Sequence, residues 1–266
     1  MTARGHKTIQ FDRFLVIDPN LTTAKMLANL LRSLSPSVQV YGAQDADKAM
    51  QLAAQVDPEL VFVEAAAAGF DGMAFTRALR RSDLACREAP VIMVFTEVKA
   101  AQILGARDSG VHEFLRRPVS LGDLERRLDA VSGRPRDWIE AVNYVGPDRR
   151  RFNSASDYQG PNKRRTDGTK AGQKINQALR IILSASRQAE ADPVQAARAL
   201  NTQARILIEL SAGQEPLKRL SAAATALQAY LQTTARQGAP LGKAQVETYA
   251  ANVMLAAPDK VRPQAA

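Results

Sequence analysis

The chain has 266 residues, of which 45% are hydrophobic, and its formal net charge is +9 at pH 7. This length allows two modest domains with packed cores, and the excess positive charge indicates an anionic partner. The single cysteine, Cys86, excludes an internal disulfide framework and is typical of a reducing compartment. No apolar run reaches the roughly 18 residues of a membrane span, and residues 1 to 12 lack the core of a signal peptide. We therefore expect a cytoplasmic, soluble protein without membrane insertion.

Short apolar runs alternate with amphipathic stretches through the first half of the chain. The runs predict five strands, at Phe14 to Ile17, Val38 to Tyr41, Leu60 to Val63, Val91 to Val94 and His112 to Leu115. Apolar residues at helical spacing predict five helices, at Leu21 to Leu34, Asp45 to Val56, Asp71 to Ser82, Lys99 to Ser109 and Ser120 to Val131. This alternation predicts an α/β fold, a doubly wound five-stranded parallel sheet with helices on both faces.

Polar residues follow the predicted strands at the edge of the sheet where a doubly wound fold carries its chemistry. Asp18 follows the first strand, Glu64 the third, Phe95-Thr96 the fourth, and Arg116 with Arg117-Pro118 the fifth. With Asp71-Gly72 placed beyond Glu64, this arrangement resembles the receiver domain of response regulators, the CheY-like family of two-component signalling, over residues 11 to 133. The resemblance implies a degenerate phosphoacceptor pocket, which would consist of Asp18, Glu64, Thr96 and Arg117.

The chain departs from that family's pattern at several functional positions. Glu64 stands where the family has its phosphoaccepting aspartate, and Pro19 replaces the second acidic residue after the first strand. Because only Asp18 and Glu64 remain as oxygen ligands, a magnesium site would be markedly weakened, and we expect no Mg²⁺ cofactor. Arg117 replaces the family's lysine, and its planar fork suits a bidentate bond to a carboxylate.

Aromatic residues occupy two positions that the family uses for switching. Phe95 stands where the family has a Ser or Thr hydroxyl, and Thr96 comes one residue late. A phenyl ring cannot donate the hydrogen bond that reports phosphorylation. Phe114 lies three residues before Arg117, where an aromatic switch residue commonly sits in the family, so some output-face geometry would survive.

Three interpretations of Glu64 and Arg117 remain open. They can form an ordinary salt bridge in an inert fold, or Glu64 can mimic the phosphorylated state because its extra methylene carries the carboxylate toward a phosphoryl position. In the third interpretation the domain is only an interaction surface. All three predict that the protein is not phosphorylated in the family's usual way.

Residues 134 to 170 contain several Pro, Gly, Asn and Ser residues, which predicts a basic linker without regular structure. A short pattern occurs twice within it. The first copy is Tyr144-Val145-Gly146-Pro147-Asp148-Arg149-Arg150-Arg151, and the second is Tyr158-Gln159-Gly160-Pro161-Asn162-Lys163-Arg164-Arg165. Each copy places a tyrosine ahead of a Gly-Pro pair and three cations, which indicates a surface built for contacts.

The side chains of this repeat are candidates for binding an anion or a nucleotide. They are Tyr144, Arg149, Arg150, Arg151, Tyr158, Lys163, Arg164 and Arg165. Arginine forks bind phosphates and stack on purines, and tyrosine adds a stacking plane, so the combination suits cyclic di-GMP as a ligand. Arginine-rich tails of this kind resemble those of receiver-like cyclic di-GMP effectors that act at the flagellar motor. Nucleic acid, an acidic protein surface, anionic lipid and a solvated linker that binds nothing remain alternatives.

Residues 171 to 257 are rich in Ala, Leu and Gln and show four stretches with helical periodicity. Their apolar faces are marked by Ile175, Leu179, Ile182 and Leu183, by Ala196, Leu200, Ile206 and Leu207, by Leu217, Leu220, Ala224, Leu227 and Leu231, and by Val246, Tyr249, Val253 and Leu255. Short loops between four helices predict an antiparallel bundle or helical hairpins. The segment contains no histidine, which excludes phosphoryl relay through it, and its apolar faces are interpreted as core, with partner docking or dimerisation as the alternative.

Enzymatic motifs are absent from the sequence, which has no Cys/His metal cluster, GxGxxG or P-loop. Its two histidines are His6 and His112, and His112 is predicted to be packed at a strand start. We therefore predict a noncatalytic adaptor of the two-component type, with a receiver-like domain, a basic linker and a helical domain, whose partner is a signalling protein such as one of the flagellar or chemotaxis machinery. The alternative is a nucleic-acid-binding regulator, although the sequence shows no clear helix-turn-helix pattern.

Overall fold

The computed structural model describes residues 11–97, 100–133, 136–149 and 170–263. The chain divides into two compact units. The first comprises Met1–Ile139 and Tyr144–Asn153, and the second comprises Glu140–Asn143 and Ser154–Ala266.

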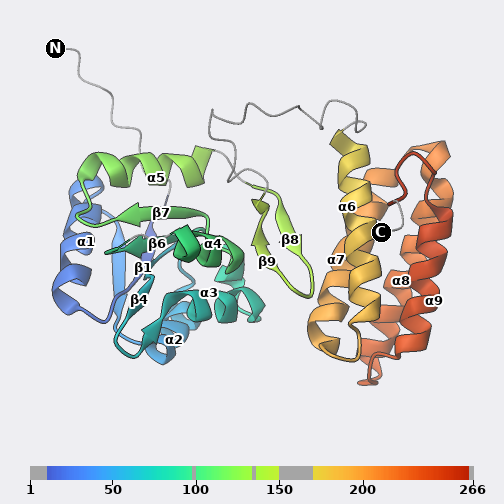
Figure 1. The fold of residues 1–266 in the computed structure, drawn as a ribbon, viewed down its shortest axis with the longest axis horizontal. Coiled ribbons are helices and arrows are strands. Elements are labelled where there is room, and N and C mark those ends of the chain that lie inside the picture. The colour runs from blue at the N-terminus through green and yellow to red at the C-terminus, as the bar shows by residue number, and fades with distance from the viewer. Residues whose placement is uncertain (1–10, 98–99, 134–135, 150–169, 264–266) are drawn as a thin grey trace, which may run out of the picture. The chain divides into compact units, whose positions relative to one another are not determined.

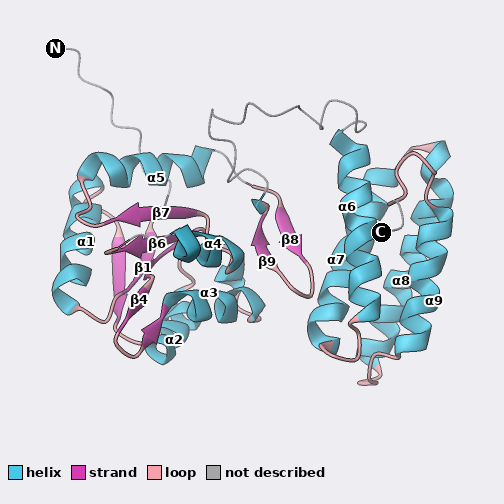
Figure 2. Cartoon of the chain, viewed as in Figure 1, coloured by secondary structure: helices cyan, strands magenta, loops and turns pink. Residues whose placement is uncertain are grey.

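A five-stranded parallel sheet forms the centre of the first unit (Figures 1 and 2). Its strands are β1 (Arg13–Ile17), β2 (Gln39–Ala43), β3 (Leu60–Glu64), β6 (Val91–Phe95) and β7 (Glu113–Arg116). They are ordered β2-β1-β3-β6-β7, so the chain winds outward in both directions from β1 and β3. In such a sheet a crevice opens beyond the carboxyl ends of the strands where the winding reverses, which is where Asp18 and Glu64 lie.

Two hydrophobic cores cover the two faces of this sheet. Because successive side chains along a strand point to opposite faces, Leu15 and Ile17 face one core while Phe14 and Val16 face the other. Helices α2 (Ala46–Val56), α3 (Gly72–Arg81) and α4 (Ala100–Asp108) contribute to the first core. Helices α1 (Leu21–Leu34) and α5 (Leu121–Gly133) contribute to the second. The predicted doubly wound sheet with helices on both faces is therefore confirmed.

Side-chain caps fix where three of these helices begin. Asn20 accepts from the backbone N–H groups of Thr22 and Thr23 at the start of α1, and Asp45 and Asp71 cap α2 and α3 in the same way. The predicted strands and helices agree with the structure to within two residues at each end. A pair of two-residue strands that the sequence did not predict, β4 (Ala66–Ala67) and β5 (Phe70–Asp71), lies between β3 and α3.

In its described residues the second unit contains four α-helices, α6 (Lys170–Arg187), α7 (Pro193–Ser211), α8 (Lys218–Arg236) and α9 (Lys243–Ala256) (Figure 1). Each packs against two others, because α6 contacts α7 and α9, and α8 contacts the same pair. This closed arrangement is a four-helix bundle rather than separate hairpins. Its core contains the predicted apolar faces with two exceptions, since Leu183 is half-buried and lies outside the core and Leu255 is 69% exposed. The prediction for Leu255 is wrong because Val253 and Ala257 take the inward positions at the end of α9.

The prediction that residues 134 to 170 lack regular structure is wrong for residues 136–149. Two short strands, β8 (Trp138–Glu140) and β9 (Val145–Pro147), pair with each other there. Tyr144 and Val145 are 7% and 5% exposed, so this segment is packed rather than solvated. The Pro and Gly residues that predicted a linker instead shape a strand pair, which a composition argument does not distinguish from a loop.

Glu140–Asn143 belong to the helical unit, although the sequence prediction placed them in the linker. Val142 is buried in the bundle core, and the Glu140 carboxylate accepts a 2.6 Å hydrogen bond from Gln195 of α7. The Glu140 carbonyl oxygen accepts a hydrogen bond from the side chain of Gln203, which lies further along the same helix. The predicted domain limits at 133 and 171 are therefore shifted. Among the described residues, no helix is both long and apolar enough to span a membrane.

Candidate functional site

Asp18 lies directly after β1 at the carboxyl edge of the sheet and is 4% exposed. The sequence that follows it fixes its carboxylate, because the Asn20 N–H donates to Oδ1 at 2.8 Å. The Thr23 hydroxyl, in the first turn of α1, donates to Oδ2 at 2.5 Å. Asp18 is therefore held by the same turn that starts the helix, and Pro19 supplies no donor or acceptor side chain to the site.

Arg117 joins the two predicted carboxylates. Its Nη2 donates to Asp18 Oδ2 at 2.6 Å and to Glu64 Oε2 at 2.8 Å, and its Nε lies 3.3 Å from the same Glu64 oxygen. The strands bring these groups together from far apart in the sequence, since Glu64 ends β3 and Arg117 follows β7. The predicted ion pair of Arg117 is confirmed, and it involves both carboxylates rather than one.

The cluster of Asp18, Glu64 and Arg117 is mostly shielded from solvent. The side chains are 5%, 8% and 18% exposed. Burial raises the pKa of Glu64 above its ordinary value of 4.5, while the hydrogen bond and charge of Arg117 offset part of that effect. A guanidinium shared by two carboxylates leaves the cluster with one net negative charge when all three groups are ionised.

The receiver fold implies a magnesium ion near these carboxylates, but the residues present do not fit one. Magnesium requires oxygen ligands in near-octahedral geometry at about 2.0 to 2.1 Å. Here the Arg117 guanidinium lies within hydrogen-bond distance of both carboxylates and takes the position of a cation between them. Over the described ranges, no three His, Cys, Asp or Glu side chains gather closely enough to hold a metal ion.

The two aromatic positions pack against each other beside this cluster. Phe95 ends β6 and is 1% exposed, and its ring meets that of Phe114 edge-on with centroids 5.8 Å apart. Thr96, which the sequence placed in the pocket, is exposed and makes no side-chain hydrogen bond with any other described residue. The structure therefore brings Asp18, Glu64 and Arg117 together, but it does not join Thr96 to them.

The described part of the first repeat copy is packed on the first unit. The Tyr144 hydroxyl donates to the Pro147 carbonyl at 2.6 Å, and burial raises the pKa of Tyr144 to about 12. Arg149 lies over the Tyr144 ring, 4.2 Å from its centroid, and pairs with Asp108 at 2.7 Å. The prediction that Tyr144 offers a stacking plane to a nucleotide is therefore wrong, because Arg149 and the protein already cover its ring.

The remaining residues of the predicted anion site lie outside the described residues. They are Arg150, Arg151, Tyr158, Lys163, Arg164 and Arg165. Binding of cyclic di-GMP, nucleic acid or lipid by these side chains stays a prediction.

Two residues with strong contacts in the first unit were missed by sequence reasoning. Thr23 donates a hydrogen bond to Asp18, and the only sequence signal for this contact is its place in the first helical turn after an acidic residue. Arg80 of α3 is 1% exposed, and its guanidinium donates to the carbonyls of Arg87, Ala89 and Gly110. Burial lowers the pKa of Arg80 to about 9. The sequence gives no sign of a buried arginine, because Arg80 and Arg81 look alike at a helix end.

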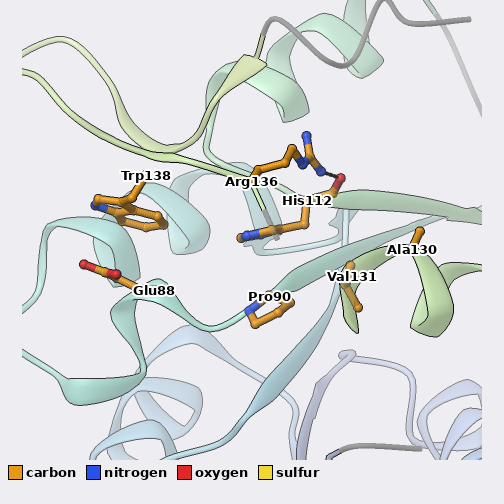
Figure 3. A pocket seen from close by; sticks show the side chains of 7 residues that line it. All are labelled: Glu88, Pro90, His112, Ala130, Val131, Arg136 and Trp138. Atoms are coloured by element: carbon orange, nitrogen blue, oxygen red, sulfur yellow. Dashed lines mark hydrogen bonds between the residues drawn. The ribbon is translucent and has the colours of Figure 1, made fainter. Parts of the chain in front are cut away.

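A cavity of about 210 Å³ lies at the opposite edge of the sheet, where β6 and β7 begin (Figure 3). Trp138 and Glu88 line one end and Ala130 and Val131 the other, with His112 and Pro90 between them. His112 Nδ1 lies 3.2 Å from both the Val91 N–H and Arg80 Nη2, and burial lowers its pKa well below 6.5. His112 is therefore packed, as predicted, and its ring accepts hydrogen bonds from its neighbours.

A parallel β2-β1-β3-β6-β7 sheet with acidic residues after β1 and β3 and a basic residue after β7 defines a receiver-like domain. Comparison with known proteins agrees, because residues 14–129 match the family described as response regulator receiver domain. This segment is a receiver domain of the response regulator family.

The matched segment covers most of some similar proteins and only part of others. A protein-glutamate methylesterase/protein-glutamine glutaminase of Nocardioides sp. is 30% identical over 122 residues, which are 45% of this chain and 32% of that protein. Chemotaxis protein CheY-3 of Vibrio cholerae is 26% identical over 119 residues, which are 45% of this chain and 90% of that protein. The chain thus spans about a third of the methylesterase and most of CheY-3. A solved receiver domain of a DNA-binding response regulator from Colwellia psychrerythraea 34H is 20% identical, with a TM-score of 0.43 over 46% of this chain and 99% of that one.

Proposed function

We propose that this protein is a noncatalytic signalling adaptor whose receiver domain works without aspartyl phosphorylation. The observation that carries this proposal is the Arg117 guanidinium, which lies within 2.6 and 2.8 Å of the Asp18 and Glu64 carboxylates. A receiver transfers a phosphoryl group to an aspartate next to a divalent cation. In this chain a glutamate replaces the acceptor, and a fixed internal cation replaces the mobile external one.

The electrostatics of the cluster favour one permanent state. Phosphoryl transfer needs a cation that neutralises the charge of the incoming group and a carboxylate that is free to attack. Glu64 already accepts two contacts from Arg117, and Asp18 is held by Arg117 and Thr23. Attack by Glu64 would require breaking a shielded ion pair, which leaves a buried charge without its partner and costs about 1 to 3 kcal/mol, between a surface pair and a fully buried one.

The packing beside the cluster supports the same proposal. A phosphorylated receiver reports its state through a hydroxyl at the end of the fourth sheet strand, where this chain has Phe95. The Phe95 ring is buried against Phe114, so no hydroxyl at that position can move toward a phosphoryl oxygen. We infer that the surface formed by β7 and its neighbouring helices keeps one conformation, in which it contacts a signalling protein partner.

Phosphorylation by a small-molecule donor tests this function. The purified full chain is incubated with acetyl phosphate and Mg²⁺, and its intact mass is measured before and after acid treatment. We expect no acid-labile phosphoprotein. A matched variant that restores the family's residues, with Pro19→Asp, Glu64→Asp, Phe95→Thr and Arg117→Lys together, is expected to gain the label if circular dichroism shows that it folds.

The single variant Glu64→Asp is the informative intermediate. It restores the acceptor but keeps Arg117 between the carboxylates and Phe95 in the hydroxyl position, so we expect it to label no better than the parent. Robust acid-labile labelling of the unaltered chain would overturn the proposed function whatever the variants do.

A further inference from the structure

The first repeat copy shows how its sequence pattern is recognised. Residues 144–149 lie on a surface of the first unit formed by Arg80, Asp108 and Gly110, which we call the Gly110 surface. Three features that the two copies share make the contacts: the tyrosine, the Gly-Pro pair and the first cation. This surface lies away from Asp18 and Glu64, so its role is independent of the proposed function.

The glycine of the pattern meets a glycine of the surface. A Cβ atom on Gly146 would lie 2.7 Å from the Gly110 Cα, and a Cβ on Gly110 would lie 2.7 Å from the Val145 carbonyl oxygen. Gly146 also has a backbone φ of +153°, which residues other than glycine rarely adopt. Any other residue at either position would force the two backbones apart.

The tyrosine and the cation hold residues 144–149 in place from the two ends of the segment. Tyr144 donates to the Pro147 carbonyl, which closes the turn around Gly146. Arg149 covers the Tyr144 ring and pairs with Asp108, whose pKa is lowered by the hydrogen bonds of Arg107 and Arg149 although burial opposes that shift. The Gly110 surface is held in turn by Arg80, whose Nε and Nη2 both donate to the Gly110 carbonyl.

The chain contains the same set of contact groups a second time. Residues 158–163 read Tyr-Gln-Gly-Pro-Asn-Lys, with the tyrosine, the Gly-Pro pair and the cation at the spacing of the seated copy. We propose that the Gly110 surface is a peptide-docking site specific for Tyr-x-Gly-Pro-Asx-cation segments, and that residues 158–163 of this chain are its second occupant. Because one surface recognises both copies, the two copies compete for it.

The differences between the copies predict which one binds more tightly. Val145 is 5% exposed, and glutamine takes its place in the second copy, so that copy must bury a polar side chain. Lysine in place of Arg149 keeps a cation for Asp108 and the tyrosine ring but loses the planar fork. The first copy therefore holds the surface at rest, and the second binds when the first is displaced.

Binding of a synthetic peptide tests the specificity of the surface. A fluorescein-labelled peptide of residues 156–166 is titrated into the full chain and into its Tyr144→Ala variant, and fluorescence anisotropy is measured. The variant is expected to bind at least tenfold more tightly than the parent, because its own first copy no longer competes. Peptides carrying Gly160→Val or Tyr158→Ala, and a scrambled peptide of the same charge, are expected to bind at least tenfold more weakly.

Cross-linking tests the proposal in a chain that keeps its first copy. In a Cys86→Ala background, Asp108→Cys is combined with Arg149→Cys, Lys163→Cys or Ser154→Cys and treated with a short bismaleimide. Arg149→Cys is expected to react fastest, and Lys163→Cys at least threefold faster than Ser154→Cys, which lies between the two copies in the sequence. On a denaturing gel, a cross-linked monomer indicates that the second copy comes from the same chain, and a cross-linked dimer indicates that it comes from another chain.

The two experiments overturn the proposal in different ways. Equal binding of the parent peptide and the Gly160→Val peptide would mean that charge alone attracts the repeat, and no binding to either protein would remove the docking site. Should Tyr144→Ala fail to fold, the cross-linking rates decide, and equal rates for Lys163→Cys and Ser154→Cys would contradict the proposal.

Discussion

At the residue scale, Arg117 determines what the receiver pocket can do. Its side chain is 18% exposed and contacts two carboxylates that are 5% and 8% exposed, so this is a shielded ionic cluster rather than a surface salt bridge. Surface pairs contribute about 0 to 1 kcal/mol, whereas removal of one member of a shielded pair is much more costly. The position of Arg117 on the loop after β7 therefore links three strands of the sheet.

Replacement of Arg117 by alanine should lower the free energy of unfolding by about 1 to 3 kcal/mol at pH 7, because two buried carboxylates lose their cation. Urea denaturation followed by circular dichroism measures it. Arg127→Ala is the matched control, since Arg127 pairs with Glu113 at 3.0 Å but is 44% exposed, and it should cost less than about 1 kcal/mol. Equal losses in the two variants would show that the cluster is no stronger than a surface pair.

The same variant should show a distinct pH dependence. Without Arg117, the pKa of folded Glu64 moves further above its ordinary value of 4.5, so folded Glu64 holds a proton that the unfolded chain has released. Stability from this group is present below the unfolded pKa and is lost as pH rises through the folded pKa. The stability difference between Arg117→Ala and the parent should therefore be smaller at pH 5 than at pH 7.

His112 should make the parent less stable in acid. Its pKa in the folded protein lies well below 6.5, so below that pH the unfolded chain binds a proton that the folded chain does not. Unfolding then takes up a proton, and stability falls by up to about 1.4 kcal/mol for each pH unit below 6.5. Urea denaturation between pH 7.5 and 5.5 measures this slope, and His112→Asn should reduce it. An unchanged slope in the variant would show that His112 is protonated in the folded state.

Sequence reasoning identified the charged members of the pocket but not the groups that orient them. Asp18, Glu64 and Arg117 follow strands in the chain, and the edge of a parallel sheet gathers such residues regardless of detail. Thr23 and Arg80 were missed because their roles depend on which way a helix turns toward the sheet. Thr96 was placed in the pocket by its residue type, whereas the position next to Phe95 leaves it exposed.

At the scale of elements, the structure follows the hydrophobic pattern closely. Strands buried on both faces read as continuous apolar runs, and β3 and β6 are buried at every residue, which is why they were predicted with small errors. The strand pair β8 and β9 was not predicted, because its three-residue strands have no measurable period. Their stability comes from contacts with Gly110 and Arg80 that are distant in the sequence.

The backbone contact between β9 and Gly110 should make that glycine sensitive to a single methyl group. Gly110→Ala places a Cβ 2.7 Å from the Val145 carbonyl at a φ of +96°, and we expect a loss of about 1 to 3 kcal/mol. Gly122→Ala in α5 is the control, because nothing lies within 4 Å of its Cβ and alanine favours a helix by roughly 0.5 to 1 kcal/mol. Thermal unfolding should show opposite shifts, and shifts of the same sign would mean that β9 does not press on Gly110.

At the scale of the whole molecule, the chain combines a receiver domain with a four-helix bundle. The hydrophobic pattern predicted both parts, since short apolar runs alternate with amphipathic stretches in the first part and long amphipathic stretches follow one another in the second. The division between them was predicted less well, because residues 140–143 belong to the bundle while residues 144–149 belong to the receiver unit. Segments that leave one unit and return to it cannot be found from local composition.

The role of Arg117 as an internal cation is tested by Mg²⁺ binding to the pocket. Thermal unfolding of the parent is measured with and without 10 mM Mg²⁺ at constant ionic strength, beside Arg117→Ala. We expect no shift for the parent and a rise for the variant, in which Asp18 and Glu64 become open to the ion. A variant that binds Mg²⁺ with a dissociation constant near 1 mM would gain about 1.4 kcal/mol at that concentration. Adding Asp18→Asn to the variant should abolish the gain, and a saturable Mg²⁺ stabilisation of the parent would show that Arg117 does not take the place of the ion.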